Sequence, residues 1–271
     1  MKRVFHTLSN ESNAASLRTA KRSADLVRLV IFLITGTFFL PARATATSVV
    51  ALIDNANHRL VIAADCRVNR QLASLSECKI VEEPGCTVAI AGLYREHATA
   101  FNLRRFVEAA CRYHGDLRQK AEAFLRLSRK SYEAAVRHIR EIDPSEFSRT
   151  IENKPTEVVF AGLLKGHVTL FVRGFVADQQ GKITTERYES SDTPNSSIGY
   201  FAGLNSRILE RVKHFKQWER LGYLEAARRF VEMEISANPN LAGLPISELE
   251  IDDHGTVHWI SRGVCDTRES D

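Results

Sequence analysis

The stretch that decides the fold is TSVVALIDNANHRLVIAADCR, residues 47–67. Two largely apolar runs, SVVALI at 48–53 and RLVIAA at 59–64, flank the polar residues DNANH at 54–58. Apolar runs of this length on either side of a turn signal predict a hairpin of buried strands. A charged residue, Asp65, follows the second run at the point where we expect that strand to end.

Residues 1–46 have the pattern of a targeting segment. Basic residues precede an apolar run at 29–40, and the small residues Ala44-Thr45-Ala46 follow it as a cleavage site. The apolar run is shorter than the about 20 residues that a membrane-spanning helix needs. We therefore expect a secretory signal, export to the periplasm or the extracellular space, and cleavage before Thr47. The alternatives are cleavage before Thr45, an uncleaved membrane anchor, an organelle transit peptide, or a protein that stays in the cytoplasm.

The formal net charge of +4 comes from this leader. Seven of the 37 Lys and Arg residues and two of the 33 Asp and Glu residues lie in 1–46, so residues 47–271 carry 30 basic and 31 acidic side chains. Without a basic excess, the body of the chain is not a nucleic-acid binder by composition. We expect no nucleic-acid partner, and contact with a membrane only through an uncleaved leader.

The cysteines and histidines do not form a metal-binding pattern. The spacing of the five cysteines fits no zinc motif, and the nine histidines show no paired spacing. We interpret most cysteines as small buried residues, and a Cys66–Cys78 disulfide is an alternative that the sequence leaves open. No metal or organic cofactor is implied.

The rest of the chain alternates between strand and helix patterns in blocks. After the hairpin we expect strands at 78–81 and 86–91, helices at 94–113 and 117–142, strands at 156–164, 168–176 and 182–188, a polar loop at 190–197, helices at 204–218 and 223–236, and strands at 247–251 and 256–260. Two sheets packed face to face, with helix pairs outside, would bury all these apolar faces. The sequence thus predicts one α+β domain at 47–261, a four-layer α-β-β-α sandwich, followed by a polar tail at 262–271.

Four short motifs in order give the chain a family resemblance. They are Thr47 at the expected new N-terminus, Ala63-Ala64-Asp65 with Arg67, Lys79 at the start of the next strand, and Ala91-Gly92. In this order and spacing, the chain resembles the proteasome β-type subunits of the N-terminal-nucleophile hydrolases over nearly all of 47–260. The resemblance implies the same four-layer fold, a peptide or amide substrate, and assembly into a homo-oligomer.

The resemblance also assigns a role to each motif. The hydroxyl of Thr47 would attack a carbonyl, and its own α-amine would accept the proton. The positive charge of Lys79 would lower the pKa of both groups, and Asp65 would hold Lys79 in place. The backbone N–H of Gly92 would stabilise the oxyanion. By the same resemblance, four residues would lie near the substrate side chain: Val68, Val81, Ile90 and Tyr94.

Two departures from the family pattern affect the residues around this site. Tyr200 follows Gly199 where active subunits carry a serine, and residues 238–243 lack the usual Asp and Ser. The leading hypothesis is an exported threonine-type peptidase or amidohydrolase that acts through an acyl-enzyme. The alternatives are a catalytically inactive scaffold or assembly subunit of the same fold, and an envelope-anchored binding protein.

Overall fold

The computed structural model describes residues 47–68, 75–76, 78–152, 154–193, 199–203, 205–212, 220–239 and 241–263, without the side chains of 67, 68, 75, 76 and 150. The expected leader at 1–46 and most of the expected tail lie outside the described residues. The domain boundaries therefore stay predictions. The Thr47–Arg67 stretch forms the expected hairpin, with strands β1 at Ser48–Asp54 and β2 at Arg59–Asp65.

The other elements follow in blocks of strands and helices. The remaining strands are β3 (Arg67–Val68), β4 (Leu75–Ser76), β5 (Ile80–Glu83), β6 (Cys86–Ala91), β7 (Arg95–Glu96), β8 (Phe101–Asn102), β9 (Pro155–Leu164), β10 (His167–Ala177), β11 (Ile183–Ser191), β12 (Gly199–Gly203), β13 (Ile246–Ile251) and β14 (Val257–Ser261). The helices are α2 (Leu103–Cys111), α3 (Leu117–Ile142), α4 (Pro144–Thr150), α5 (Ser206–Arg211) and α7 (Tyr223–Ala237).

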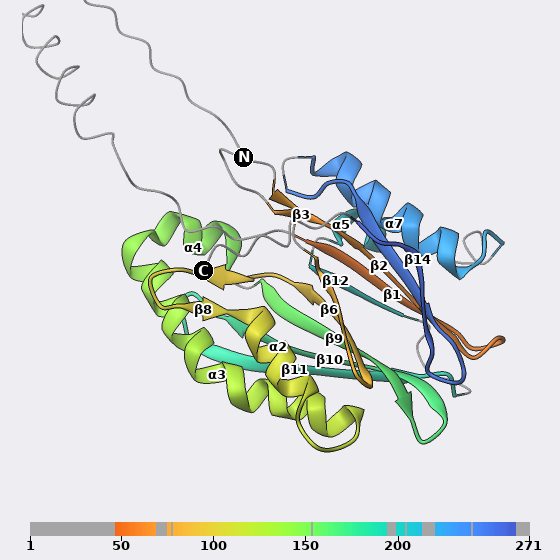
Figure 1. Cartoon of the computed structure of the whole chain (residues 1–271). Helices are drawn as coiled ribbons and strands as arrows, with labels where there is room; N and C mark the ends of the chain where they lie inside the picture. The colour runs from red at the N-terminus through yellow and green to blue at the C-terminus, as the bar shows by residue number, and fades with distance from the viewer. Residues whose placement is uncertain are drawn as a thin grey trace, which may run out of the picture. The chain divides into compact units, whose positions relative to one another are not determined.

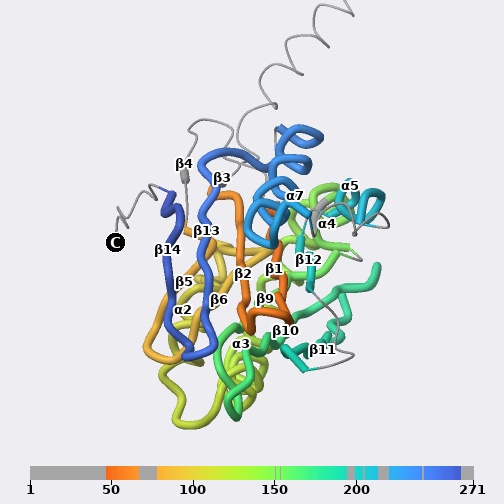
Figure 2. Tube along the Cα trace, turned by 90° about the vertical axis from the view of Figure 1, so that its right-hand side faces the viewer, coloured from red at the N-terminus to blue at the C-terminus, as the bar shows by residue number. Residues whose placement is uncertain are grey.

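Ten of these strands form two antiparallel sheets. The first has the order β12-β1-β2-β13-β14 and the second the order β11-β10-β9-β6-β5. Figure 2 shows the strands of the first sheet side by side. Helices α2 and α3 pack on the outer face of the second sheet, and α7 packs on the outer face of the first (Figure 1). The predicted four-layer α-β-β-α architecture is confirmed.

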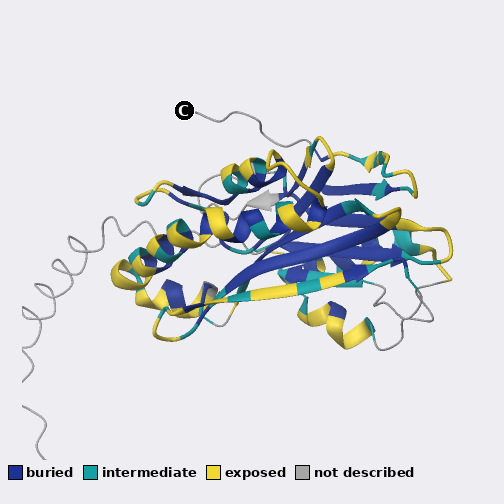
Figure 3. Ribbon diagram, turned by 90° about the horizontal axis from the view of Figure 1, so that it is seen from below, coloured by how far each residue is buried: buried dark blue, intermediate teal, exposed yellow. Residues whose placement is uncertain are grey.

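The core has three apolar layers because both faces of each sheet are covered. Along β6, Val88 and Ile90 point into the cluster beneath α2 and α3, whereas Ala89 and Ala91 point into the cluster between the sheets. On the first sheet, Val50 and Leu52 point outward to α7. In Figure 3 the central strands are dark blue, and the exposed residues lie on the outer surfaces of the helices, in the turns and along the edge strand β11. Strands buried on both faces read as continuous apolar runs, which explains the pattern at 48–53 and 59–64.

Three expected elements are wrong in part. The helix expected at 94–113 begins only at Leu103, because Ala100 has a φ of +55° and the Glu96 side chain accepts hydrogen bonds from the backbone N–H groups of Ala98 and Thr99. The polar loop expected at 190–197 begins inside β11, and β12 after it was missed. The helix expected at 204–218 is α5 at its start, while residues 213–219 lie outside the described part of the chain.

The cysteines also differ from expectation. Cys86 and Cys111 form a disulfide between β6 and α2 with their Cα atoms 5.7 Å apart, and Cys78 is disulfide-bonded too. Cys66 is a free, buried thiol, so the alternative of a Cys66–Cys78 bridge is wrong. Cys66, Cys86 and Cys111 are buried, as expected for most of the cysteines, although two of these three are disulfide-bonded.

The outer helix layer of the first sheet gives a test of the fold. Phe230 on α7 is fully buried against the first sheet and packs edge-on against Phe201. Phe230→Ala should lower the free energy of unfolding by about 3–5 kcal/mol, measured by urea denaturation, because it leaves a large cavity. Leu209→Ala on α5, where the side chain is half exposed, is the control and should change stability by less than about 0.5 kcal/mol. Equal losses would contradict this packing.

Candidate active site

Asp65 holds the beginning of β1 in place. Its side chain is fully buried at the end of β2, and its Oδ1 accepts a hydrogen bond of 2.8 Å from the backbone N–H of Ser48. Its Oδ2 accepts a second bond, of 3.2 Å, from the N–H of Gly243. The segment 238–243, which lacks the family's Asp and Ser, therefore contributes a backbone donor. A buried carboxylate needs such partners, so Asp65 fixes the residue next to Thr47.

Thr47 lies directly before β1 and is 1% exposed in the full-length chain. Its Oγ1 is buried and accepts or donates no hydrogen bond within the described part of the chain. Its carbonyl oxygen packs against Gly203, where a Cβ atom would lie 1.9 Å from that oxygen and 3.1 Å from the Cβ of Ala91. Gly203 also has a φ of +72°, so only glycine fits there. Thr47 thus lies beside the end of β6.

Gly92 forms the turn that follows β6. Its φ is +96°, and a Cβ atom would lie 2.6 Å from the Cα of Thr156 and 2.9 Å from the carbonyl oxygen of Pro155. The next N–H, from Leu93, donates to the Thr156 hydroxyl oxygen at 3.0 Å, and that oxygen also accepts a hydrogen bond of 3.1 Å from the Tyr132 hydroxyl. The backbone after Ala91 is therefore held in one conformation that other residues cannot adopt without strain.

Lys79 is buried just before β5. Its carbonyl accepts a hydrogen bond of 2.9 Å from the N–H of Ile90, and its ammonium lies 4.7 Å from the ring centroid of Tyr94. A cation over an aromatic face at this distance is stabilised electrostatically. Lys79 is only 1% exposed, so its ammonium group lies in the interior of the protein rather than in solvent.

The pKa of the Cys66 thiol is affected by the charges of both Asp65 and Lys79. Burial raises the pKa of the Cys66 thiol, the Asp65 carboxylate raises it further, and the Lys79 ammonium lowers it. Both charged groups therefore act on one point at the end of β2. The thiol is also 3.1 Å from the Ser247 hydroxyl. A buried thiol with a raised pKa is a poor nucleophile, which leaves the hydroxyl of Thr47 as the better candidate.

The four expected catalytic residues thus come from neighbouring strand ends. Asp65 binds the N–H of Ser48, Gly203 packs against both the Thr47 carbonyl oxygen and Ala91, and the Lys79 carbonyl binds the N–H of Ile90 two residues before Gly92. Their catalytic roles stay predictions. Of the four expected pocket residues, Val81, Ile90 and Tyr94 are buried in the cluster beneath α2 and α3, and Val68 lies in β3 with its side chain outside the described residues.

Sequence analysis missed a buried acid beside this group. Glu157 on β9 is 2% exposed; its Oε1 accepts a hydrogen bond from the Tyr200 hydroxyl, and its Oε2 accepts one of 3.2 Å from the N–H of Gly203. Burial raises the pKa of Glu157 despite these donors. The signal was a lone charge within the apolar run TEVVFAGLL. Such a residue in a strand buried on both faces needs a partner.

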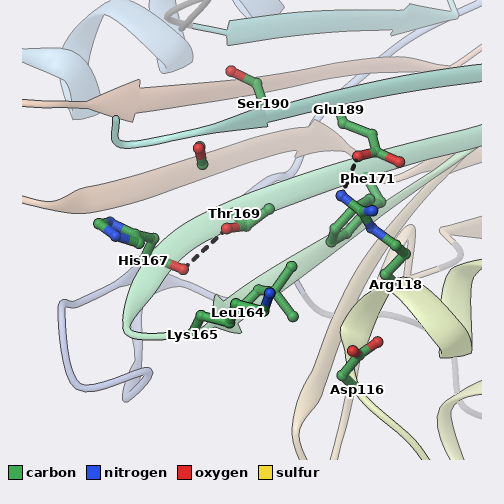
Figure 4. Close-up of a pocket in the computed structure, with 10 residues that line it drawn as sticks. Asp116, Arg118, Leu164, Lys165, His167, Thr169, Phe171, Glu189 and Ser190 are labelled. Atoms are coloured by element: carbon green, nitrogen blue, oxygen red, sulfur yellow. Dashed lines mark hydrogen bonds and ion pairs between the residues drawn. The ribbon is translucent and has the colours of Figure 1, made fainter. Parts of the chain in front are cut away.

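A surface cavity of about 370 Å³ lies elsewhere (Figure 4). It is lined by the β9–β10 turn, the end of β11 and the start of α3, where Arg118 donates to Glu189 at 2.7 Å. The turn begins at Leu164, which is about 23 Å along β9 from Glu157. None of the four expected catalytic residues lines this cavity, so it is not the candidate active site.

Within its described residues, the protein has neither a cluster of metal-binding side chains nor a helix that could cross a membrane. No group of three or more His, Cys, Asp or Glu side chains within them is arranged to hold a metal ion. No helix among them is long and apolar enough to cross a membrane.

Comparison with solved structures gives matches at low sequence identity, of which one is described here. No protein-family model and no curated protein matches the chain. A solved structure, Thiobacillus denitrificans BPH in complex with epoxomicin, is 14% identical with a TM-score of 0.42, covering 76% of this chain and 98% of that one. A match at this TM-score is too weak to support a conclusion about activity.

The turn after β6 gives a test of the site's backbone. Gly92→Ala should lower the free energy of unfolding by more than about 2 kcal/mol, because it adds a collision with Thr156 to the cost of a left-handed backbone. Gly166→Ala is the matched control: its φ is +80°, but a Cβ there meets nothing within 4 Å, so it should cost only about 1 kcal/mol. Urea denaturation measures both, and equal costs would show that the turn is not constrained by Thr156.

Proposed function

We propose that the mature protein is an exported amide-bond hydrolase, most simply a threonine-type peptidase, that uses Thr47 as an N-terminal nucleophile. The observation that carries the proposal is the grouping at one end of the two sheets of a buried threonine hydroxyl, a buried lysine, a buried aspartate and a glycine turn. Cleavage between Ala46 and Thr47 would add the missing base, a free α-amine with a pKa near ~8.

The proposed reaction has two acyl-transfer steps. The Thr47 hydroxyl attacks the substrate carbonyl and gives its proton to the α-amine, which passes it to the leaving amine as the C–N bond breaks. The resulting ester is hydrolysed by water, whose proton returns to Thr47 through the same amine. Lys79 would favour the deprotonated hydroxyl through its positive charge, and the N–H of Gly92 would donate to the oxyanion.

Export is supported by the leader pattern and by a disulfide. The Cys86–Cys111 bond joins two elements of the core, and structural disulfides persist in oxidising compartments outside the cytosol.

A homo-oligomer is part of the proposal. Two large apolar side chains on the outer helix α3, Leu127 and Ile142, are nearly half exposed and are candidates for such a contact.

A catalytically inactive scaffold or assembly subunit is the second candidate. Tyr200 stands in place of the usual serine, and its hydroxyl binds Glu157 instead of Thr47. The two candidates share the fold and differ in whether Thr47 reacts.

The decisive experiment is chemical labelling of the exported protein. Intact mass with N-terminal sequencing should show a chain that begins at Thr47, and a peptide vinyl sulfone should add once to that residue. Thr47→Ala should abolish labelling because the nucleophile is removed, while Thr47→Ser should retain it. A start at Thr45, an intact leader, or labelling that survives Thr47→Ala would contradict the enzyme hypothesis.

The charge of Lys79 gives a second test of the mechanism. Lys79→Met keeps an unbranched apolar side chain of similar length beside the Tyr94 ring but removes the ammonium. We expect the labelling rate of Thr47 to fall by roughly 100-fold or more, since the hydroxyl loses its electrostatic activation. Lys130→Met, on the outer surface of α3, is the matched control and should react like the wild type. An unchanged rate in Lys79→Met would remove Lys79 from the mechanism.

A further inference from the structure

We propose that Glu157 is a positioning residue for Thr47, which it holds through Gly203 with Tyr200 as its hydrogen-bond partner. The inference deepens the proposed function and rests on it for its link to catalysis. It assigns a role to the buried acid on β9 and to Tyr200, which is one of the two departures from the family pattern.

The backbone makes room for a carboxylate at this point between the sheets. Glu157 lies opposite Ala91 on β6 and opposite Gly174 on β10, and Gly174 in turn lies opposite Glu186 on β11. A Cβ at Gly174 would lie 2.7 Å from the Thr156 carbonyl oxygen and 3.2 Å from the Cγ of Glu157. The two neighbours of Glu157 are therefore small, and a larger residue at 174 would displace its side chain.

The carboxylate connects the second sheet to the edge of the first. Tyr200 and Gly203 both lie on β12, and each gives one hydrogen bond to a different oxygen of Glu157. Gly203 is also the residue that pairs with Ser48 and packs on the carbonyl oxygen of Thr47. Glu157 thus reaches the nucleophile through one residue, while Asp65 reaches it from the other side through the N–H of Ser48.

The burial of Glu157 is the reason to assign Glu157 and its partner Tyr200 a role beyond stability. A buried carboxylate costs free energy that an apolar residue of similar volume would not, and such a residue could hold two sheets together equally well. What an apolar residue could not do is fix the N–H of Gly203 by a charge-assisted hydrogen bond. Because Gly203 packs on the carbonyl oxygen of Thr47, the hydrogen bond from Gly203 to Glu157 helps to fix the position of Thr47.

The ionisation of Glu157 makes the role measurable. Burial raises its pKa, the hydrogen bonds from Tyr200 and Gly203 lower it, and the charge of Glu186 raises it. The titratable groups that face it are Tyr200 on β12 and Glu186 on β11, and the ring of Tyr188 on β11 lies 4.9 Å from the Tyr200 ring, tilted by 38°. Ala91 and Gly174, from β6 and β10, do not titrate. Protonation of Glu157 as the pH falls should weaken its hold on Gly203, so reactivity should show an acid-side loss in addition to the one caused by protonation of the α-amine.

The experiment measures the rate at which Thr47 reacts with the peptide vinyl sulfone across pH. Glu157→Gln should lower the maximal rate about tenfold or more with little change in the melting temperature, because the shape is kept and the charge is lost. Tyr200→Phe removes a donor that favours the charged acid, so the acid limb should move to higher pH. Glu186→Gln removes a repelling charge, so the limb should move to lower pH.

A matched control and a double variant complete the design. Tyr188→Phe removes, from the aromatic neighbour of Tyr200, a hydroxyl that donates to the Gly199 carbonyl, and it should leave the profile unchanged. In the Glu157→Gln background, Tyr200→Phe should no longer move the acid limb. The inference is overturned if Glu157→Gln reacts at the wild-type rate, or if Tyr200→Phe leaves the limb in place.

A separate measurement distinguishes this inference from the proposed function. If the wild type itself does not react, the proposed function fails, and amide hydrogen exchange then tests the positioning role. Exchange at 48–52 and 199–203 should be faster in Glu157→Gln than in the wild type, because the bond to Gly203 is weaker. Unchanged exchange in both segments would overturn the role.

Discussion

The buried carboxylate of Asp65 is the constraint on which the rest of the site depends. It accepts one hydrogen bond from the residue after Thr47 and another from the loop before β13, and both bonds are shielded from water. A charge in such a place must be satisfied, so the beginning of β1 and the loop at 241–245 cannot move independently of β2. The hairpin at 47–67 thus contains Asp65, the residue that holds its first strand in place, so its sequence pattern is informative about both the fold and the site.

The sheets and their layers could be predicted because burial on both faces leaves a simple pattern. The continuous apolar runs of β1, β2, β6 and β9 read directly as buried strands, and the blocks of strands and helices indicate which faces must be covered. The edge strand β12 could not be found this way. Gly199–Gly203 has glycine at both ends, and its strand conformation depends on pairing with β1, a contact that local sequence does not show.

The candidate site was predictable to the extent that its residues stand in fixed places on those strands. Asp65 is the last residue of β2, Lys79 directly precedes β5 and Gly92 directly follows β6, so their positions follow from those of the strands. Glu157 was missed because it lies near the start of an otherwise apolar run, and its partners come from a segment to which no element was assigned. The lesson is physical: a lone acid in a strand with two covered faces indicates a specific donor across the sheet interface, even before that donor is known.

The two buried acids have different relations to the proposed chemistry. Asp65 binds the chain at Ser48, after Thr47, and Glu157 binds Gly203, which packs on the carbonyl between Thr47 and Ser48. These hydrogen bonds therefore act on the carboxyl side of Thr47. They do not involve the bond between residues 46 and 47. Breaking that bond would change one group alone, from an amide that cannot accept a proton to an amine that can, within a frame that is already built. In the proposed enzyme, cleavage would therefore switch on a base without requiring the core to rearrange.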